Sequence, residues 1–429
     1  MMKWLTGLFC LLVSAVAAGC GGDGSEKKSE TTPASSGEKV TLTVWDWSVP
    51  PPEAMAKVDA AFTEEHPNIT IERVQHPADT FQALLRSAFA SKKGPDVFLS
   101  FASPYALDFE NGIQPLGEYL TDEDYQKVDG YKQSANSEGE PLVAPLDGNG
   151  VVFYYDKAKF AKAGIDSPPK TWNDLVDSCE KLKQAGITPI VAGFKDGGML
   201  QLLMAGLAPQ YMSDEETVAG VQDPDWEHPA MEQSLAKIQD LFNRECFTPG
   251  SEGIVLFPDT VNNFKAGKGA MMLGFEATDV HWGIFRETKW GKKGLGTFMM
   301  PYDEEGNWDA PRMNYAASSG YAIAKASDHP AEAAEYVRYI NSAPAQEMLF
   351  AEAGVFPVNR DAKVNVTDPV AGQILEWIKT EQHYAGQLQL ARANVEVLLL
   401  RYVPQLITGE KSWGDIAPEL TAEQEKSER

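Results

Sequence analysis

The chain has 429 residues, 43% of them hydrophobic, which is more than one ordinary core requires and predicts two domains. Its 62 acidic residues outnumber its 37 lysines and arginines, giving a formal net charge of -25. An acidic surface of this size repels phosphate backbones and anionic lipid, so nucleic acid is not expected as a partner.

The first predicted element is a secretion signal over residues 1–19. Lys3 supplies a single charge, residues 4–16 are mostly apolar, and the run is too short for a membrane span of about 20 residues. The small residues of "AVAAGC" then lead to Cys20 and resemble the bacterial lipoprotein box, in which the cysteine carries lipid, although Ala17 stands where leucine is usual. An ordinary signal peptide with an incidental cysteine is the alternative.

Residues 20–39 are predicted to be a flexible tether, because the sequence after Cys20 has no large apolar side chain to bury. A lipid, a tether and then a folded body predict an extracytoplasmic protein anchored to the cell membrane, at the cell surface or in the periplasm.

Strands and helices are predicted to alternate from residue 40 onward. The strands are Val40–Trp45, Ile69–Val74 and "GPDVFLS", and the helices are Glu53–Glu65 and Asp79–Ser91. This alternation predicts a largely parallel sheet covered by helices on both faces.

The alternation starts again after "EPLVAPLDGNGVVFYYDK". The predicted elements are a helix capped by Thr171, a strand at Thr188–Val191, a helix at 229–244, strands in "GKGAMMLGFE" and at 318–325, and helices at Asp328–Asn341, 369–380, 386–408 and 412–426. Two such units predict two lobes, with a ligand cleft beyond the carboxyl ends of the strands.

Two cysteines, Cys179 and Cys246, remain in the predicted body. Export permits a disulfide between them. Cys179 lies on the apolar face of a predicted helix, so a buried thiol is the other interpretation.

The stretch "TLTVWDWSVPP" ends a predicted strand with Trp45, Asp46 and Trp47. Sugars present C–H faces that lie flat on aromatic rings and hydroxyl edges that hydrogen-bond short polar groups. The triplet offers both, so it predicts a sugar site, whereas packing of the tryptophans in the core is the structural alternative.

The ordered series of segments resembles the bacterial extracellular solute-binding proteins of the carbohydrate-import type, family 1, which deliver ligands to ABC importers. The matching segments include "AFTEEHPNITIERV", "GPDVFLS", "YYDKAKFAKAGI" followed by "PPKTWNDL", "NNFKAGKGAMMLGFE", "SSGYAIAKASDHPAEAAEYVRYINS" and "GVFPVN".

The resemblance implies a two-lobed, hinged periplasmic-binding-protein fold of the α/β class that closes around a sugar. The N-lobe would comprise residues 40–148 plus 315–355, and the C-lobe residues 149–314 plus 356–429. The partners implied are a sugar ligand and the permease subunits of an ABC transporter, with the protein a monomer held to the membrane through Cys20.

The resemblance also implies ligand-binding loops. Carried over onto this sequence, together with two weaker candidates near the C-terminal helices, they give Trp45, Asp46, Trp47, Ser100, Ser103, Asp147, Asn149, Phe194, Asp196, Phe275, Glu276, Ser319, Phe356, Tyr384 and Gln387. One position departs from the family pattern, since Ala277 stands where many relatives have an aromatic residue. Phe275 or Trp282 could substitute for it.

No catalytic residue, metal ligand or cofactor is predicted. The six histidines have no metal-site spacing, and neither HExxH nor G-x-S-x-G occurs. A secreted glycosidase would need two carboxylates about 5–10 Å apart, for which the sequence offers no signature. A binding protein for a polyamine or a peptide is the nearer alternative.

Overall fold

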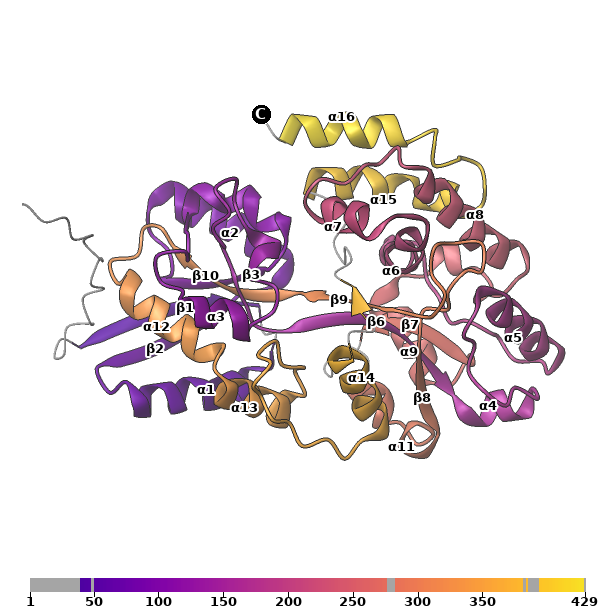
Figure 1. Ribbon diagram of the computed structural model, residues 1–429, viewed down its shortest axis with the longest axis horizontal. Helices are drawn as coiled ribbons and strands as arrows, with labels where there is room; N and C mark the ends of the chain where they lie inside the picture. The colour runs from indigo at the N-terminus through magenta and orange to yellow at the C-terminus, as the bar shows by residue number, and fades with distance from the viewer. Residues whose placement is uncertain (1–38, 48–49, 276–281, 381–382, 385–392, 428–429) are drawn as a thin grey trace, which may run out of the picture. The chain divides into compact units, whose positions relative to one another are not determined.

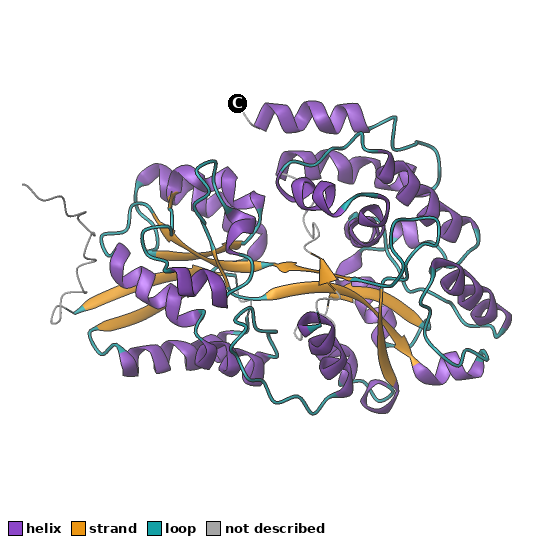
Figure 2. Cartoon of the chain, in the orientation of Figure 1, coloured by secondary structure: helices purple, strands orange, loops and turns teal. Residues whose placement is uncertain are grey.

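The computed structural model describes residues 39–47, 50–275, 282–380, 383–384 and 393–427. Its described strands form two sheets, each with helices on both faces (Figure 2). The predicted α/β class is therefore confirmed.

The first sheet has the strand order β2-β1-β3-β10-β4, with β5 also paired to β10. Figure 1 labels β1, β2, β3 and β10 of this sheet. The strands are β1 (Val40–Asp46), β2 (Ile69–Gln75), β3 (Val97–Phe101), β4 (Ile113–Gln114), β5 (Ala144–Pro145) and β10 (Ser319–Ala324). Strands β1, β2 and β3 are parallel, as the alternation predicted, whereas β10 runs antiparallel to its neighbours.

The side chains of each strand alternate between the two faces of the sheet, so both faces carry side chains that must be buried. Helices cover both faces. The helices are α1 (Pro52–Glu65), α2 (Ala78–Ser91), α3 (Asp122–Lys127), α12 (Pro330–Ile340) and α13 (Ala343–Ala353), with 3-10 helices η1 (Pro104–Gly112) and η2 (Tyr131–Ser134). Leu42 and Val44 pack with α1, α12 and α13, whereas Phe98 packs with Phe81 and Leu85 of α2 on the opposite face.

The second sheet has the order β11-β9-β6-β7, with β8 paired to β6. The strands are β6 (Gly148–Asp156), β7 (Met271–Phe275), β8 (Leu295–Met299), β9 (Met313–Ala317) and β11 (His383–Tyr384). Strand β6 is antiparallel to β7, β8 and β9, and among the described strands of this second sheet only β11 and β9 pair in parallel. The expectation of a largely parallel sheet is therefore wrong here, because residue patterns reveal strands but not the direction in which distant strands pair.

The second sheet packs into one large core with the remaining helices. These are α4 (Lys157–Lys162), α5 (Trp172–Gln184), α6 (Gly198–Leu207), η3 (Ala208–Tyr211), α7 (Asp214–Gln222), α8 (Pro229–Asn243), η4 (Ser251–Gly253), η5 (Leu256–Thr260), α9 (Val261–Lys265), α10 (Trp282–Arg286), α11 (Gly291–Gly294), α14 (Pro369–Lys379), α15 (Ala393–Ile407) and α16 (Ala417–Ser427). The strand predicted at Thr188–Val191 is reduced to isolated bridges at Ile190. The last helix begins at Ala417 rather than at 412.

The chain passes from the first sheet to the second between β5 and β6 and returns between β9 and β10. The two connections are hydrogen-bonded to each other. The Leu146 amide donates to the Ser319 carbonyl at 2.8 Å, and the Ser318 amide donates to the Asp147 carbonyl at 3.1 Å. The two sheets are thus linked by a paired two-stranded ribbon.

Candidate functional site

Two tryptophans stand where β1 ends, and both keep part of their surface exposed. Trp45 meets His76 edge-on, with ring centroids 4.6 Å apart. Trp47 meets the buried Phe81 of α2 edge-on at 5.0 Å. Because β1 alternates its side chains, both rings lie on the α2 side of the first sheet.

Trp47 continues into a row of rings that runs from β3 into η1. Its centroid lies 5.3 Å from that of Phe101, which lies 5.4 Å from that of Tyr105. All three side chains are half-buried. We call Trp47, Phe101 and Tyr105 the aromatic ledge. Burial, reinforced by the Asp108 carboxylate, raises the pKa of Tyr105, so its hydroxyl stays protonated at neutral pH.

Two predicted site residues support this ledge. Ser103 caps η1, and its Oγ accepts a hydrogen bond from the Tyr105 amide at 3.3 Å, which orients the start of the helix. Ser100 is buried in β3 and lies opposite Gly320 of β10, next to the pairing of Phe101 with Ser319. The carboxyl end of β3 is thereby fixed against β10.

Asp147 and Ser319 are the predicted residues that the structure brings into direct contact. Both are buried, and Asp147 Oδ1 accepts hydrogen bonds from the Ser319 amide and hydroxyl. Since Ser319 pairs with Phe101, this contact lies one strand pairing away from the aromatic ledge. It belongs to the ribbon between the sheets.

Asp46 does not lie beside Trp45 and Trp47 as an exposed hydrogen-bond acceptor. Its side chain is on the opposite face of β1 and is 1% exposed, with a hydrogen-bonded ion pair to Arg73 of β2. Arg73 also binds both carboxylate oxygens of Asp59 at 2.9 Å. In this structure Asp46 holds the end of β1 in place, because strand alternation turns it away from Trp45 and Trp47.

Further predicted residues lie on the second sheet and its loops. Asn149 of β6 is opposite Ala316, and its Oδ1 is buried without a hydrogen-bond partner among the described residues. Phe275 ends β7, and its carbonyl accepts a 2.8 Å hydrogen bond from the Tyr154 hydroxyl. Tyr384 pairs with Asn314 through the backbone of β11. Asp196 is exposed in a loop and accepts from the Leu256 amide at 2.9 Å.

Two predicted contacts, Phe194 and Phe356, are core residues. Phe194 is completely buried and meets Phe247 edge-on at 5.1 Å. Phe356 is 1% exposed and packs on Phe350. Neither ring presents a face to a ligand in this structure. Glu276, Gln387, Cys20 and the departing position Ala277 lie outside the described residues.

Sequence reasoning missed Phe101, Tyr105 and His76. The signal for the first two was present in "SFASPY", where aromatic residues follow the end of β3. His76 follows β2 in the same way, and its Nε2 is buried without a hydrogen-bond partner within the described part of the chain. Carboxyl ends of neighbouring strands gather side chains that are distant in sequence, which single motifs do not reveal.

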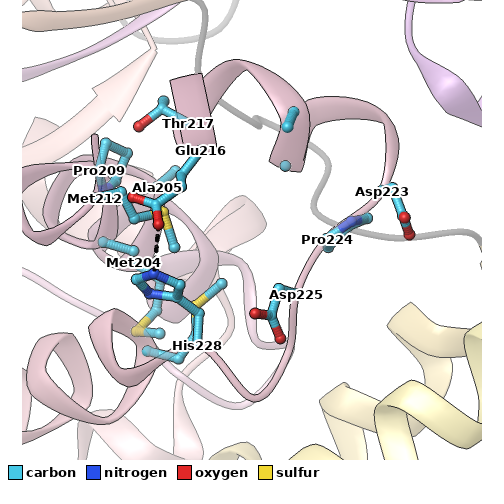
Figure 3. A pocket seen from close by; sticks show the side chains of 14 residues that line it. Met204, Ala205, Pro209, Met212, Glu216, Thr217, Asp223, Pro224, Asp225 and His228 are labelled. Atoms are coloured by element: carbon cyan, nitrogen blue, oxygen red, sulfur yellow. Dashed lines mark ion pairs between the residues drawn. The ribbon is translucent and has the colours of Figure 1, made fainter. Parts of the chain in front are cut away.

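A separate cavity of about 190 Å³ lies among α6, α7 and α8 and shares no lining residue with the aromatic ledge (Figure 3). Met204, Met212 and Met231 supply apolar lining. Glu216 faces His228, with Glu216 Oε1 and His228 Nε2 3.7 Å apart (Figure 3). Within the described ranges, no group of histidines, cysteines and carboxylates is arranged to hold a metal ion. No helix there has both the length and the apolar character needed to cross a membrane.

Comparisons with curated proteins give relatives of binding-protein type. The chain is 22% identical over 392 residues to an uncharacterized ABC transporter extracellular-binding protein of Pyrococcus horikoshii, covering 87% of this chain and 83% of that protein. A second such protein of that archaeon is 33% identical over 190 residues, 43% of this chain and 44% of the relative. The chain therefore spans less than half the length of that relative. An sn-glycerol-3-phosphate-binding periplasmic protein of Brucella melitensis is 25% identical over 63% of each chain.

Solved structures share the fold. A chitin oligosaccharide binding protein superposes with a TM-score of 0.76 at 21% identity, covering 91% of this chain and 99% of its own. A maltose-bound MalE3 of T. maritima gives 0.68 at 20% identity, covering 89% of this chain and 99% of its own. These matches confirm the predicted binding-protein fold.

A family model described as bacterial extracellular solute-binding protein matches residues 47–347. This match includes the Trp47, Phe101 and Tyr105 of the aromatic ledge and the Asp147–Ser319 contact. Because it spans most of the chain, the protein belongs to the family of bacterial extracellular solute-binding proteins.

Proposed function

We propose that this protein is the substrate-binding component of an ABC importer and that it captures an uncharged sugar or oligosaccharide on the aromatic ledge. The observation that carries the proposal is the row of three half-buried rings, Trp47, Phe101 and Tyr105, in mutual contact at the carboxyl ends of β1 and β3. Membership of the family supports a solute-binding role, and the rings of the aromatic ledge indicate the chemical class of the solute.

The rings have the properties that sugar stacking requires. Each is held by the core on one side and keeps exposed surface on the other, so little side-chain entropy is lost on binding. Covering roughly 100 Å² of apolar area on one ring contributes about 2.5 kcal/mol. Two or three rings give about 5–7 kcal/mol, against about 8 kcal/mol for a micromolar complex. Hydrogen bonds to sugar hydroxyls and domain closure must supply the difference.

The relatives differ in the solutes that their names carry: chitin oligosaccharide and maltose for two solved structures, and sn-glycerol 3-phosphate for a curated protein. Arginine and lysine side chains are frequent partners of a phosphate ester. Arg73 of β2 is bound to Asp46 and Asp59, and Arg86 of α2 stacks over the Phe109 ring at 4.6 Å. The engagement of both arginines favours a neutral solute over an anionic one. A polyamine or a peptide remains the alternative class, and a secreted glycosidase a more distant one.

The proposed cycle needs two lobes and a hinge. We take the lobes as residues 40–148 plus 315–355 and residues 149–314 plus 356–429, with the hinge in the ribbon that Asp147 and Ser319 hold together. A ligand that contacts both lobes stabilises the closed form, and the closed protein then delivers its solute to a membrane permease. In this proposal the protein acts as a monomer, anchored outside the cytoplasm by lipid at Cys20, and performs no covalent chemistry.

The deciding experiment is a thermal-shift screen of the purified protein against mono- and oligosaccharides, sn-glycerol 3-phosphate, spermidine and short peptides. A ligand that binds only the folded state stabilises it, by about 2.7 kcal/mol at a ligand concentration a hundred times the Kd. The melting temperature rises as a result. The proposal expects the shift with one or more sugars. A shift with glycerol phosphate, spermidine or a peptide in place of every sugar would overturn the assignment of the solute.

A further inference from the structure

The cavity among α6, α7 and α8 has no role in the proposed sugar site, and its floor is apolar. Met204 and Ala205 come from α6, Ala208 begins η3, and Met231 comes from α8. These four side chains are buried, whereas Met212, which follows η3, is half-buried. Methionine side chains are unbranched and flexible, so a floor built from three of them adapts to ligands of different shape.

The cavity is large enough for a small organic molecule. Its volume is about 190 Å³. An apolar cavity of about 150 Å³ is large enough to admit benzene, and such cavities stay dry. Side chains that border a cavity lack some of the dispersion contacts of a close-packed core, so a ligand that fills the space supplies them. The cavity therefore favours a ligand whose apolar body is about the size of one six-membered ring.

The mouth of the cavity is acidic. Glu216 of α7 and two residues of the loop after it, Asp223 and Asp225, line the mouth and are exposed (Figure 3). Among the described residues that line the cavity, none is a lysine or an arginine. The polar end of a bound molecule would therefore lie in a negative potential.

The Glu216 carboxylate is charged, and the imidazole beside it does not offset that charge. Glu216 Oε2 accepts from the Ser213 amide at 2.7 Å and from its hydroxyl at 2.8 Å, and these hydrogen bonds lower the pKa of Glu216. His228 Nδ1 accepts a hydrogen bond from the Ala230 amide at 3.1 Å, so this nitrogen carries no proton and the ring is neutral in this arrangement. Glu216 Oε1 lies 3.7 Å from His228 Nε2, beyond hydrogen-bond length.

The segment that carries Asp223 and Asp225 is held in position by α16. Asp223 Oδ1 accepts from the Gln424 side-chain amide at 2.6 Å, and the Trp226 indole donates to Gln424 Oε1 at 2.5 Å. Asp225 Oδ1 accepts from the Glu227 amide at 3.0 Å. Because these donors are neutral amides, they position the two carboxylates without cancelling their charge.

We propose that this cavity is a second binding site, specific for a protonated monoamine with a small apolar body. The body packs against Met204 and Met231, and the ammonium group lies at the mouth among Glu216, Asp223 and Asp225. An anion is repelled there, and a sugar is disfavoured because its hydroxyl groups would meet thioether and methyl groups on the floor in place of hydrogen-bond partners. The site does not depend on the proposed function, since its lining shares no residue with the aromatic ledge.

The test uses benzylamine as the probe and the purified protein labelled with carbon-13 at its methionine methyl groups. NMR spectra recorded at low ionic strength follow these methyl signals, which single methionine-to-leucine variants assign. We expect saturable shifts of the Met204, Met212 and Met231 signals. Met55 is the internal control, because it is buried in the core of the first sheet and its signal should not move. The absence of saturable shifts at the three cavity methionines would overturn the inference.

Related probes separate the charge of the ligand from its apolar body. Benzyl alcohol keeps the ring without the charge and should bind roughly threefold to tenfold more weakly, because exposed carboxylates contribute modestly in water. Benzoate should not bind. Spermidine is cationic along its length and should leave the three methyl signals in place, despite the net charge of -25 on the chain. Equal affinity for benzyl alcohol and benzylamine would overturn the cationic ligand, and equal shifts with spermidine would overturn the apolar one.

Variants of the site give a second readout. Ala205→Leu places a larger side chain in the cavity and should abolish the benzylamine shifts. Should this variant fail to fold, Glu216→Gln decides, because Glu216 is exposed and glutamine also suits the capping box. It should weaken benzylamine binding roughly threefold and leave benzyl alcohol binding unchanged. Glu215→Gln is the matched control, since Glu215 is an exposed carboxylate of α7 that does not line the cavity. Equal benzylamine affinity in Glu216→Gln and Glu215→Gln would contradict the proposed position of the ammonium group.

Discussion

Asp147 and Ser319 are joined by two hydrogen bonds that end on the same carboxylate oxygen, one from the Ser319 amide at 2.8 Å and one from its hydroxyl at 2.9 Å. Asp147 lies in the connection from β5 to β6, Ser319 begins β10 directly after the returning connection, and both are buried. One side chain of the outgoing connection thus organises the backbone of the returning one.

Replacing Asp147 with alanine should therefore destabilise the protein by about 1–3 kcal/mol, because it leaves a buried amide and a buried hydroxyl without their acceptor. Urea unfolding measures this loss. Ser319→Ala removes only the hydroxyl bond and should cost less, and Asp147→Asn keeps an oxygen acceptor and should also be milder. Equal unfolding free energies for wild type and Asp147→Ala would contradict this role.

Trp47→Ala should weaken binding of the best sugar roughly 30-fold, about 2 kcal/mol, because it removes the ring that joins β1 to Phe101 on the aromatic ledge. Isothermal titration calorimetry gives the change in Kd. Tyr125→Ala is the matched control, since Tyr125 is an exposed aromatic residue on α3, outside the ledge. An unchanged Kd for Trp47→Ala, or an equal loss in both variants, would reject the ledge as the binding surface.

Arg73→Met should cost about 3–5 kcal/mol of stability, because it leaves the buried carboxylate of Asp46 and the largely buried carboxylate of Asp59 without their cation. Adding Asp46→Asn to this variant removes one of the unpaired charges and should recover part of the loss. Chemical denaturation of the single and double variants tests the coupling. If the second substitution adds its own loss in full, the two groups do not act as a pair.

The buried Asp303 carboxylate should make stability depend on pH in the acid range. Burial by itself raises its pKa, but hydrogen bonds from Lys237, at 2.8 Å, and from Tyr211 outweigh burial and hold the pKa below the ordinary 3.8. A lowered folded-state pKa gives stabilisation that is complete above the unfolded value and is lost as the pH falls through the folded value.

The difference in unfolding free energy between wild type and Asp303→Asn should therefore be constant near neutral pH and shrink below about pH 4. Denaturant titrations at a series of pH values measure it. Glu305→Gln is the control, because Glu305 also contacts Lys237 but is exposed. A difference that grows as the pH falls would show that the sign of the shift is wrong.

Local patterns predicted the first part of the fold closely. The helix expected at Glu53–Glu65 is α1, Pro52–Glu65, and the strand expected at Val40–Trp45 is β1, which extends to Asp46. Apolar spacing and the prolines before α1 act over a few residues, so sequence reasoning reaches them. The second sheet is different, since a long helical insertion separates β6 from β7, and β6 also pairs with β8 and β9 from later in the chain.

The candidate site shows the same division. The tryptophans, the two serines at the end of β3 and just after it, and the polar residues at the sheet connections were recognisable as types of residue suited to a sugar. Their partners were not, because Arg73, Phe101 and Tyr105 reach Asp46 and Trp47 only through strand pairing. Phe194 followed a predicted strand, yet the fold buries it against Phe247.

The sequence by itself determined the class of protein, the order of its elements and the presence of sugar-compatible side chains, because these follow from composition, periodicity and an ordered series of segments. Tertiary structure decided which of those side chains remain at the surface and which are buried and hold other parts of the fold in place. Strand alternation places Trp45 and Trp47 on one face and turns Asp46 to the other, where a buried arginine binds it. Whether a side chain is exposed or buried depends on what packs against its face of the sheet. The residues that pack there are distant from it in the chain.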